Sequence, residues 1–288
     1  MSQSYLIVVM AAGLLVAWAG LLRSFGWRAH IAESNYQSNL IRLEEALLAN
    51  PAPASIVGSS ITGRLMPEYF DETSLGRIGN LGLDGSGPLL GLELLASRSE
   101  VSPVVVIEAN LLMVPEGVND RALRNAVNGF GFKLAGRTPM LRAETRPTSL
   151  IYSWLKRRKD AMAGSNLTSS DAGTSPVGPS TQEVRLDQNT PAELAAHQQR
   201  VFELCQRLQS RGRRLILLRF PISTSIVQTQ FHPLDFTGRL ATELQIRRVD
   251  LGLELRKRGH EPRFTDGTHL NPQSARLAAS ILDQIVKE

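Results

Sequence analysis

The sequence predicts an α/β fold in which helices cover both faces of a parallel β-sheet, preceded by one membrane-spanning helix. Three observations support this prediction. Short apolar or β-branched runs recur along the chain, helical stretches separate them, and an uncharged apolar segment stands near the N-terminus. With 288 residues, 42% of them hydrophobic, the chain is long enough to bury a substantial core.

The N-terminal segment has the length and composition of a transmembrane helix. Residues 5–22 carry no charged side chain, and as a helix they would span about 27 Å, close to the hydrocarbon core of a bilayer. A cleaved signal peptide is the alternative, because "AWAG" offers small residues for cleavage. The uncharged start "MSQS" and the long apolar run favour an uncleaved anchor over residues 1–25.

After the anchor, residues 26–52 are predicted to form a stalk helix and a linker. Leucines recur at helical spacing between charged residues over positions 32–48, and the prolines of "NPAPA" then end the helix. Residues 53–288 are predicted to form the main domain.

Four buried strands are predicted in this domain, at residues 55–57, 77–81, 103–107 and 214–220. Helices are predicted at residues 88–98, 191–210, 238–256 and 273–286. Since strands alternate with helices, the sheet should be parallel. Residues 163–181 are mostly Gly, Ser, Thr and Pro, which predicts a flexible loop in the region 160–185.

Charge and cysteine content narrow the function classes. The net charge is only +5, and the one tight basic cluster, residues 156–159, lacks aromatic interleaving, so we expect a surface facing solvent or membrane and no nucleic-acid partner. The single cysteine, Cys205, excludes an intrachain disulfide and a cysteine-based metal cluster. No metal and no cofactor are predicted.

Two motifs carry residue types that nucleophilic catalysis uses. "SIVGSSITGRL" places Ser59 and Ser60 directly after the first predicted strand, and "FTDGTHLNPQSA" places Asp266 three residues before His269 on a turn that Gly267 permits. A serine becomes nucleophilic when a base removes its proton and an acid orients that base. A turn serine and a helix-capping loop with a surface histidine are the structural alternatives.

These motifs resemble, in the same chain order, the blocks of the SGNH, or GDSL-like, hydrolase superfamily, which folds as a flavodoxin-like three-layer α/β/α sandwich. The resemblance implies that Ser60 is the nucleophile, His269 the base and Asp266 the orienting acid. It extends over nearly the whole region after the anchor.

The two middle blocks imply the groups that stabilise an oxyanion. "NLGLDGSG" resembles the second block and implies Gly85 as a donor beside the N–H of Ser60, with Gly82 as a near alternative. "VVVIEANLL" resembles the third block and implies Asn110 as the side-chain donor. The chain departs from the family twice, with Ser59 where an aspartate is usual and Glu108 where a glycine is usual.

Membrane-anchored members similar to alginate acetylation proteins modify envelope polysaccharides, with the acyl group supplied through a multispanning membrane partner. The resemblance therefore implies O-acyl transfer, most often of acetyl, to an exopolysaccharide or cell-wall glycan by a domain outside the inner membrane, in the periplasm. Arg23 and Arg28 oppose that orientation, because positive charge favours the cytoplasmic side. A carbohydrate esterase or lipase-like hydrolase, and a non-catalytic assembly or glycan-binding protein, are the alternatives.

Overall fold

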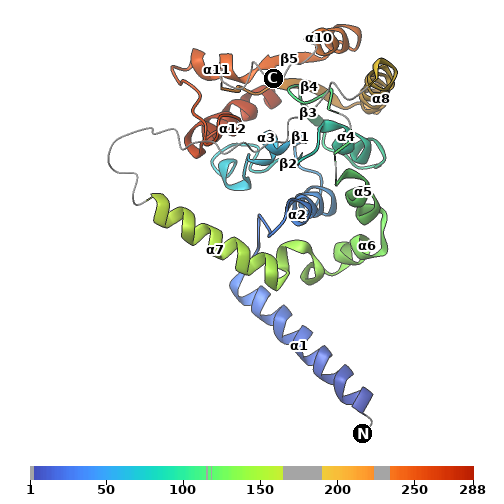
Figure 1. Ribbon diagram of the computed structural model, residues 1–288, viewed down its shortest axis with the longest axis vertical. Coiled ribbons are helices and arrows are strands. Elements are labelled where there is room, and N and C mark those ends of the chain that lie inside the picture. The colour runs from blue at the N-terminus through green and yellow to red at the C-terminus, as the bar shows by residue number, and fades with distance from the viewer. Residues whose placement is uncertain (1–2, 115, 118, 165–189, 224–233) are drawn as a thin grey trace.

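Five parallel strands form one sheet in the order β2-β1-β3-β4-β5 (Figure 1). The structure is a computed structural model that describes residues 3–114, 116–117, 119–164, 190–223 and 234–288. The strands are β1 (Ala54–Ser59), β2 (Gly79–Leu83), β3 (Val104–Glu108), β4 (Arg214–Arg219) and β5 (Arg247–Asp250). This is the flavodoxin-like order, so the predicted α/β fold class is confirmed.

Helices cover both faces of the sheet. On one face lie α2 (Asn35–Leu48), α4 (Pro88–Ala96), α8 (Pro191–Ser210) and α10 (Leu234–Glu243). On the other lie the single turn α3 (Ser60–Gly63), α11 (Leu251–Lys257) and α12 (Pro272–Lys287). Alternate residues of β1, β3 and β4 enter the two hydrophobic cores, because successive side chains of a strand point to opposite faces.

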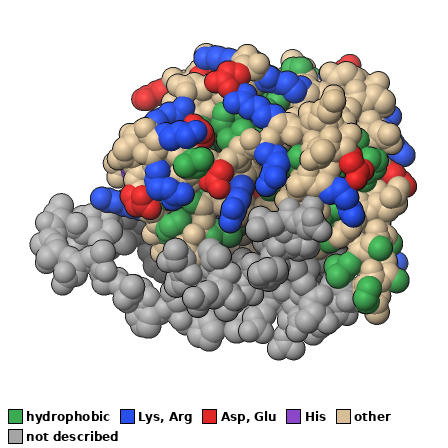
Figure 2. All heavy atoms as spheres, turned by 90° about the horizontal axis from the view of Figure 1, so that it is seen from above, with side chains coloured by type: hydrophobic (Ala, Val, Ile, Leu, Met, Phe, Trp, Pro, Cys, Tyr) green, Lys and Arg blue, Asp and Glu red, His purple; other side chains and the backbone are tan. Residues whose placement is uncertain are grey.

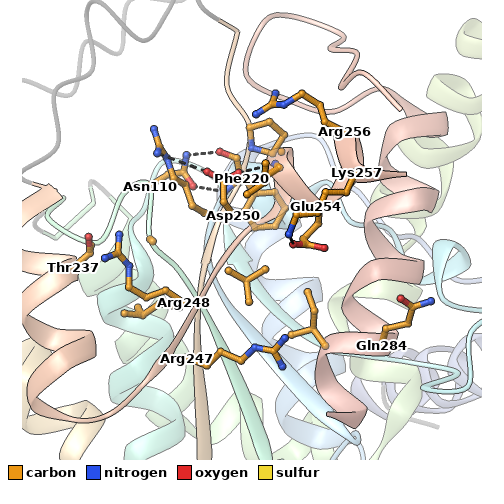
Figure 3. A pocket seen from close by; sticks show the side chains of 18 of the residues that line it. Asn110, Phe220, Thr237, Arg247, Arg248, Asp250, Glu254, Arg256, Lys257 and Gln284 are labelled. Atoms are coloured by element: carbon orange, nitrogen blue, oxygen red, sulfur yellow. Dashed lines mark hydrogen bonds and ion pairs between the residues drawn. The ribbon is translucent and has the colours of Figure 1, made fainter. Parts of the chain in front are cut away.

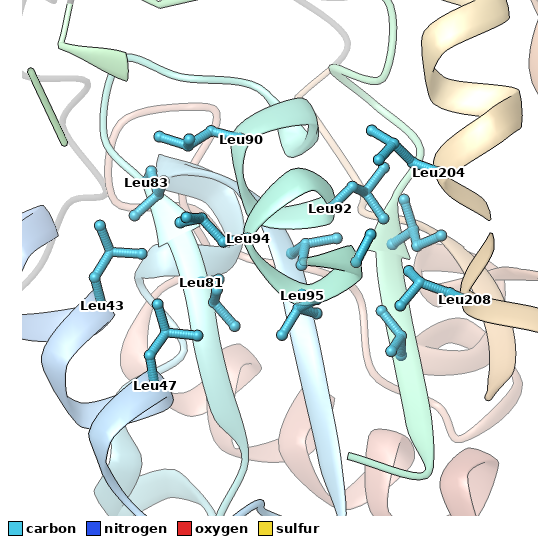
Figure 4. Packing of buried hydrophobic residues seen from close by; sticks show 14 of the residues in the cluster. Leu43, Leu47, Leu81, Leu83, Leu90, Leu92, Leu94, Leu95, Leu204 and Leu208 are labelled. Carbon is cyan, nitrogen blue, oxygen red and sulfur yellow. The ribbon is translucent and has the colours of Figure 1, made fainter. Parts of the chain in front are cut away.

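Leucines dominate the core on the α4 side (Figure 4). Leu81 and Leu83 of β2 pack between Leu43 and Leu47 of α2 and the leucines of α4, and Leu204 and Leu208 of α8 close the far side. Every residue of β1 and of β3 is buried. The two central strands are therefore fixed by packing on both faces, and the loops at their carboxyl ends start from rigid positions.

The order of the strands in the sheet changes direction between β1 and β3. β2 joins one side of β1 and β3 the other, so the connections leave the carboxyl ends of these strands in opposite directions. In open α/β sheets, ligands bind at this switch point. Ser60 directly follows the end of β1, and Asn110 follows the end of β3.

The N-terminal helix α1 (Gln3–Phe25) projects away from the rest of the molecule (Figure 1). Its segment Ser4–Phe25 has a mean hydropathy of 2.3, and only 6% of its most apolar 18-residue stretch is buried. Among the described residues, it is the one helix long and apolar enough to cross a membrane. The position agrees with the predicted anchor.

The predicted stalk helix packs on the sheet. The buried residues of α2 include Leu40, Leu43 and Leu47, and α2 contacts β2 directly. The helical spacing of these leucines was read correctly, but an apolar stripe on a free stalk would stay in water, and burial against β2 is favoured instead.

One helix was predicted wrongly. The range 238–256 contains the end of α10, the whole of β5 and most of α11. Gln245 takes a positive φ of 52°, which ends the helical path after α10. β5 is a four-residue edge strand with a single well-buried residue, Val249, so its sequence carries almost no apolar signal.

A helical subdomain connects β3 to α8. It contains α5 (Asp120–Asn128), α6 (Phe130–Arg137), α7 (Pro147–Gly164) and short 3-10 turns at Pro139–Leu141 and Ala143–Thr145. Another 3-10 turn, Pro67–Tyr69, lies between α3 and β2. Residues 160–164 of the predicted flexible loop belong to α7, and residues 165–185 lie outside the described residues.

Candidate active site

Ser60 stands at the junction of β1 and α3, on the carboxyl edge of the sheet. β1 ends at Ser59, whose hydroxyl caps α3 by accepting the N–H of Ile61 at 3.1 Å. Ser60 is then the first helical residue, and its side chain is partly accessible. A buried strand followed at once by a helical turn fixes the serine where substrate can reach it.

The loop that carries His269 is closed by its own hydrogen bonds. Asp266 Oδ1 accepts the backbone N–H groups of Thr268 and His269 at 3.1 and 2.9 Å. The N–H of Thr265 donates to the carbonyl of His269 at 2.8 Å, and Gly267 turns the chain with a φ of 86°. α12 begins directly after the loop, with its first turn capped by Asn271.

The structure joins Ser60, His269 and Asp266 in one hydrogen-bonded chain. His269 Nε2 lies 2.9 Å from Ser60 Oγ, and His269 Nδ1 lies 2.6 Å from Asp266 Oδ2. Partial burial opposes ionisation of Asp266, but hydrogen bonds from the backbone and ring of His269 outweigh it and lower the pKa of the carboxyl to about 2. Asp266 is therefore a carboxylate that accepts Nδ1–H, which leaves Nε2 to accept the Ser60 hydroxyl proton.

Gly85 lies in the turn after β2, on the same edge as Ser60. Its φ of 75° is in the left-handed region that glycine adopts without strain. Next to it, the buried Asp84 is held by α2, where Arg42 forms an ion pair of 3.0 Å with the carboxylate and Asn39 exchanges two hydrogen bonds with the Asp84 backbone. The role of Gly85 as an oxyanion donor remains a prediction.

Gly82, the alternative to Gly85, has a packing role. A Cβ atom on Gly82 would lie 2.2 Å from the backbone nitrogen of Gly63, so the residue allows α3 to approach β2 closely. That contact presses the turn that carries Ser60 against the sheet.

Asn110 bonds to the neighbouring loop. Its side-chain Nδ2 donates to the carbonyl of Phe220 at 3.0 Å, and its Oδ1 accepts the Phe220 N–H at 2.7 Å. These bonds tie the loop after β3 to the loop after β4. The side-chain amide has two N–H groups, and this pairing uses one of them.

Glu108 and Ser59 form a buried hydrogen-bonded pair next to Ser60. Ser59 donates its N–H to Glu108 Oε2 at 2.8 Å and directs its hydroxyl to both carboxyl oxygens at 2.9 and 3.0 Å. Burial raises the pKa of the Glu108 carboxyl to about 7, although hydrogen bonds from Ser59 favour its ionised form. The sequence marked both residues as departures from the family pattern but did not reveal that they touch.

A groove of about 850 Å³ runs along the open β5 edge (Figure 3). Asn110 and Phe220 line one end, and Arg247 and Arg248 of β5 line the wall. Lys and Arg side chains gather on this side of the molecule (Figure 2). Three ion pairs within the groove offset much of that charge: Arg219–Asp250 at 3.7 Å, Arg247–Glu288 at 2.5 Å and Lys257–Glu254 at 2.7 Å. Because β5 was not predicted, this groove was not predicted either.

Among the described residues, no group of three or more His, Cys, Asp and Glu side chains is arranged to hold a metal ion. Cys205 is buried in α8, where burial raises the pKa of its thiol to about 12. A thiol in that setting is a packing group and not a nucleophile.

No protein-family model and no curated protein sequence matches the chain. Among solved structures, it is similar to a crystal structure of a protein from Bacteroides fragilis that is provisionally described as an acylhydrolase. The two are 13% identical with a TM-score of 0.42, over 85% of this chain and 93% of the other. A likeness this distant says nothing about activity.

Proposed function

We propose that the chain is a membrane-anchored serine enzyme that cleaves and transfers acyl esters. The observation that carries the proposal is the continuous hydrogen-bonded chain from Ser60 Oγ through His269 to Asp266, with distances of 2.9 and 2.6 Å. Nucleophile, base and orienting acid stand in the required order, at the edge of the sheet where α/β folds bind ligands.

In this mechanism, Ser60 Oγ attacks an acyl carbonyl while His269 Nε2 takes the hydroxyl proton. Asp266 stabilises the imidazolium that forms, and the N–H groups of Ser60 and Gly85 and the second amide N–H of Asn110 are the proposed donors to the oxyanion. Collapse of the tetrahedral intermediate breaks the ester bond, and the leaving alkoxide takes the proton from His269. An acyl-Ser60 intermediate remains.

The second half of the reaction repeats these steps with an acceptor. His269 removes a proton from an acceptor hydroxyl, which attacks the acyl-Ser60 carbonyl and releases the serine. With a sugar hydroxyl as acceptor the reaction is O-acyl transfer, and with water it is hydrolysis. We propose O-acyl transfer, with acetyl as the acyl group, to an envelope glycan outside the inner membrane. A multispanning membrane protein is the proposed acyl donor. The anchor α1 and the resemblance to membrane-anchored acetylation proteins support this choice.

The test is acyl turnover by purified full-length protein in detergent, with p-nitrophenyl acetate as donor. Ser60→Ala and His269→Ala should each lower kcat on the order of 10³-fold or more, and Asp266→Asn should also be severely impaired because it favours the wrong tautomer. Ser59→Ala keeps the backbone N–H that Glu108 accepts and should lose about tenfold at most.

Adding short oligosaccharides to the same assay separates transfer from hydrolysis. Mass spectrometry that finds acetylated oligosaccharide in a Ser60-dependent manner supports transfer. Release of acetate alone supports an esterase.

A non-catalytic glycan-binding or assembly protein is the second candidate, and the engagement of Asn110 with Phe220 is the observation that favours it. Folded protein that shows no turnover above Ser60→Ala with any acyl ester would place this candidate first.

A further inference from the structure

We infer that Glu108 is a positioning residue that holds the turn carrying Ser60 in the orientation that faces His269. Among the described residues, the hydrogen bonds of Glu108 go to Ser59, and the Ser60 hydroxyl bonds to His269. Glu108 acts on the residues before and after the serine, and its contribution to turnover rests on the proposed function.

The carboxyl of Glu108 occupies a space that the sequence keeps open for it. Glu108 ends β3 beside β1, and its side chain is fully buried. A Cβ atom on Gly58 would lie 2.4 Å from Glu108 Oε2 and 2.8 Å from Glu108 Cβ. Glycine at position 58 is therefore required by the glutamate on the adjacent strand.

The carboxyl is hydrogen-bonded to the residue before Ser60 and lies beside a residue after it. Before the serine, Ser59 donates its N–H and its hydroxyl to the two carboxyl oxygens. After the serine, Thr62 lies beside the carboxyl, because a Cβ atom on Gly58 would lie 2.5 Å from Thr62 Oγ1 and 2.4 Å from Glu108 Oε2. Thr62 Oγ1 in addition donates to the Ser59 carbonyl at 3.0 Å, which closes the turn on itself.

Ser59 transmits this hold to the helix that Ser60 begins. The hydroxyl that points at Glu108 also accepts the Ile61 N–H at 3.1 Å. The peptide groups on either side of Ser60 are thus fixed relative to β3, while Ser60 Oγ itself bonds only to His269 Nε2 among the contacts of the described residues. A serine whose neighbours are fixed needs little reorganisation to reach the attacking geometry.

Stability alone does not account for a glutamate at this position. The hydrogen-bond donors to its carboxyl among the described residues are the N–H and the hydroxyl of Ser59, and removing a carboxyl from water without a cation as partner is costly. Groups that are costly to bury and are retained next to a reactive side chain are typical of functional sites.

Glu108→Gln is the direct test, because it keeps the shape of the side chain and turns one acceptor oxygen into a donor. Glu44→Gln is the matched control, since Glu44 is another buried glutamate whose carboxyl accepts a backbone N–H, that of Ala143 at 2.6 Å. Both variants are compared with the parent as full-length protein in detergent, at a temperature where circular dichroism shows all three folded.

The first readout does not depend on activity. Amide hydrogen exchange at residues 59–62 should be about tenfold faster in Glu108→Gln than in the parent, the factor expected when one hydrogen bond to a charged acceptor is lost. Glu44→Gln should leave these four amides unchanged. Unchanged exchange at residues 59–62 in Glu108→Gln would overturn the inference whatever the chain catalyses.

The second readout is p-nitrophenyl acetate turnover. Glu108→Gln should lower kcat about tenfold or more with KM within twofold, and Glu44→Gln should match the parent. If Glu108→Gln exchanges faster but keeps the parent kcat, the turn is held but Ser60 is not positioned by it, and the inference fails. A parent no more active than Ser60→Ala contradicts the proposed function, and the exchange result then decides the role of Glu108 in the turn.

Discussion

At the scale of single residues, the carboxyl of Glu108 makes folding depend on pH. Its pKa of about 7 in the folded protein lies above the ordinary value of 4.5. Between these two values the folded protein binds a proton more tightly than the unfolded chain. The free energy of unfolding should therefore fall as pH rises from about 4.5 to 7, by up to about 3 kcal/mol from this group.

Glu108→Gln should remove that dependence. Relative to the parent, the variant should gain up to about 3 kcal/mol in free energy of unfolding between pH 5 and pH 8, measured by urea denaturation at each pH. Glu203→Gln, on the exposed side of α8, should show no such trend. A difference between Glu108→Gln and the parent that is constant with pH would show that the carboxyl titrates normally.

Short motifs predicted Ser60, His269 and Asp266 as members of one site, and the structure brings the three side chains together. Asp266 and His269 are three residues apart, so one loop decides their contact, and a serine directly after a buried strand is expected at the sheet edge. The pairings of Ser59 with Glu108 and of Asn110 with Phe220 join residues 49 and 110 positions apart. Such contacts depend on strand order, which a single sequence does not specify.

At the scale of elements, α2 holds the turn after β2 through a buried ion pair. The side chains of Arg42 and Asp84 are 6% and 8% exposed, and Arg42 also donates to the Gly82 carbonyl at 2.8 Å. The helix predicted to be a stalk thus supports the turn that contains Gly85.

Arg42→Ala should lower the free energy of unfolding by about 3–5 kcal/mol, because it leaves the Asp84 carboxylate buried without its partner. Lys257→Ala removes an exposed pair with Glu254 and should cost less than about 1 kcal/mol. Thermal or urea denaturation of both variants checks this. Equal effects would show that the Arg42 pair is as well solvated as the surface one.

Periodicity predicted the central strands and the helices α4, α8 and α12 well, but it missed α7 and failed at the edge strand β5. The bounds of α8 match the prediction because a full amphipathic stripe and a capping box at Thr190 mark the helix. β5 is short, charged and paired on one side, so its sequence pattern could not be distinguished from the helical patterns of α10 and α11 beside it. For α2 the helix was predicted, but its partner β2 could not be read from the leucine pattern alone.

At the scale of the whole molecule, one apolar helix precedes a single α/β domain, and the proposed chemistry requires that domain outside the cytoplasm. Arg23 and Arg28 give a weak opposing bias in orientation. Fusions of alkaline phosphatase and of green fluorescent protein to the C-terminus should show phosphatase activity and no fluorescence. Fluorescence without phosphatase activity would place the domain in the cytoplasm and contradict a role in envelope glycan modification.

The central claim is that Ser60 is an activated nucleophile, and covalent labelling tests it most directly. Folded full-length protein is treated with a fluorophosphonate, digested, and analysed by tandem mass spectrometry to locate the adduct. We predict one phosphonylated residue, Ser60, with labelling abolished in Ser60→Ala, strongly slowed in His269→Ala and retained in Ser59→Ala. An adduct on Ser59, or no adduct on protein that is demonstrably folded, would contradict it.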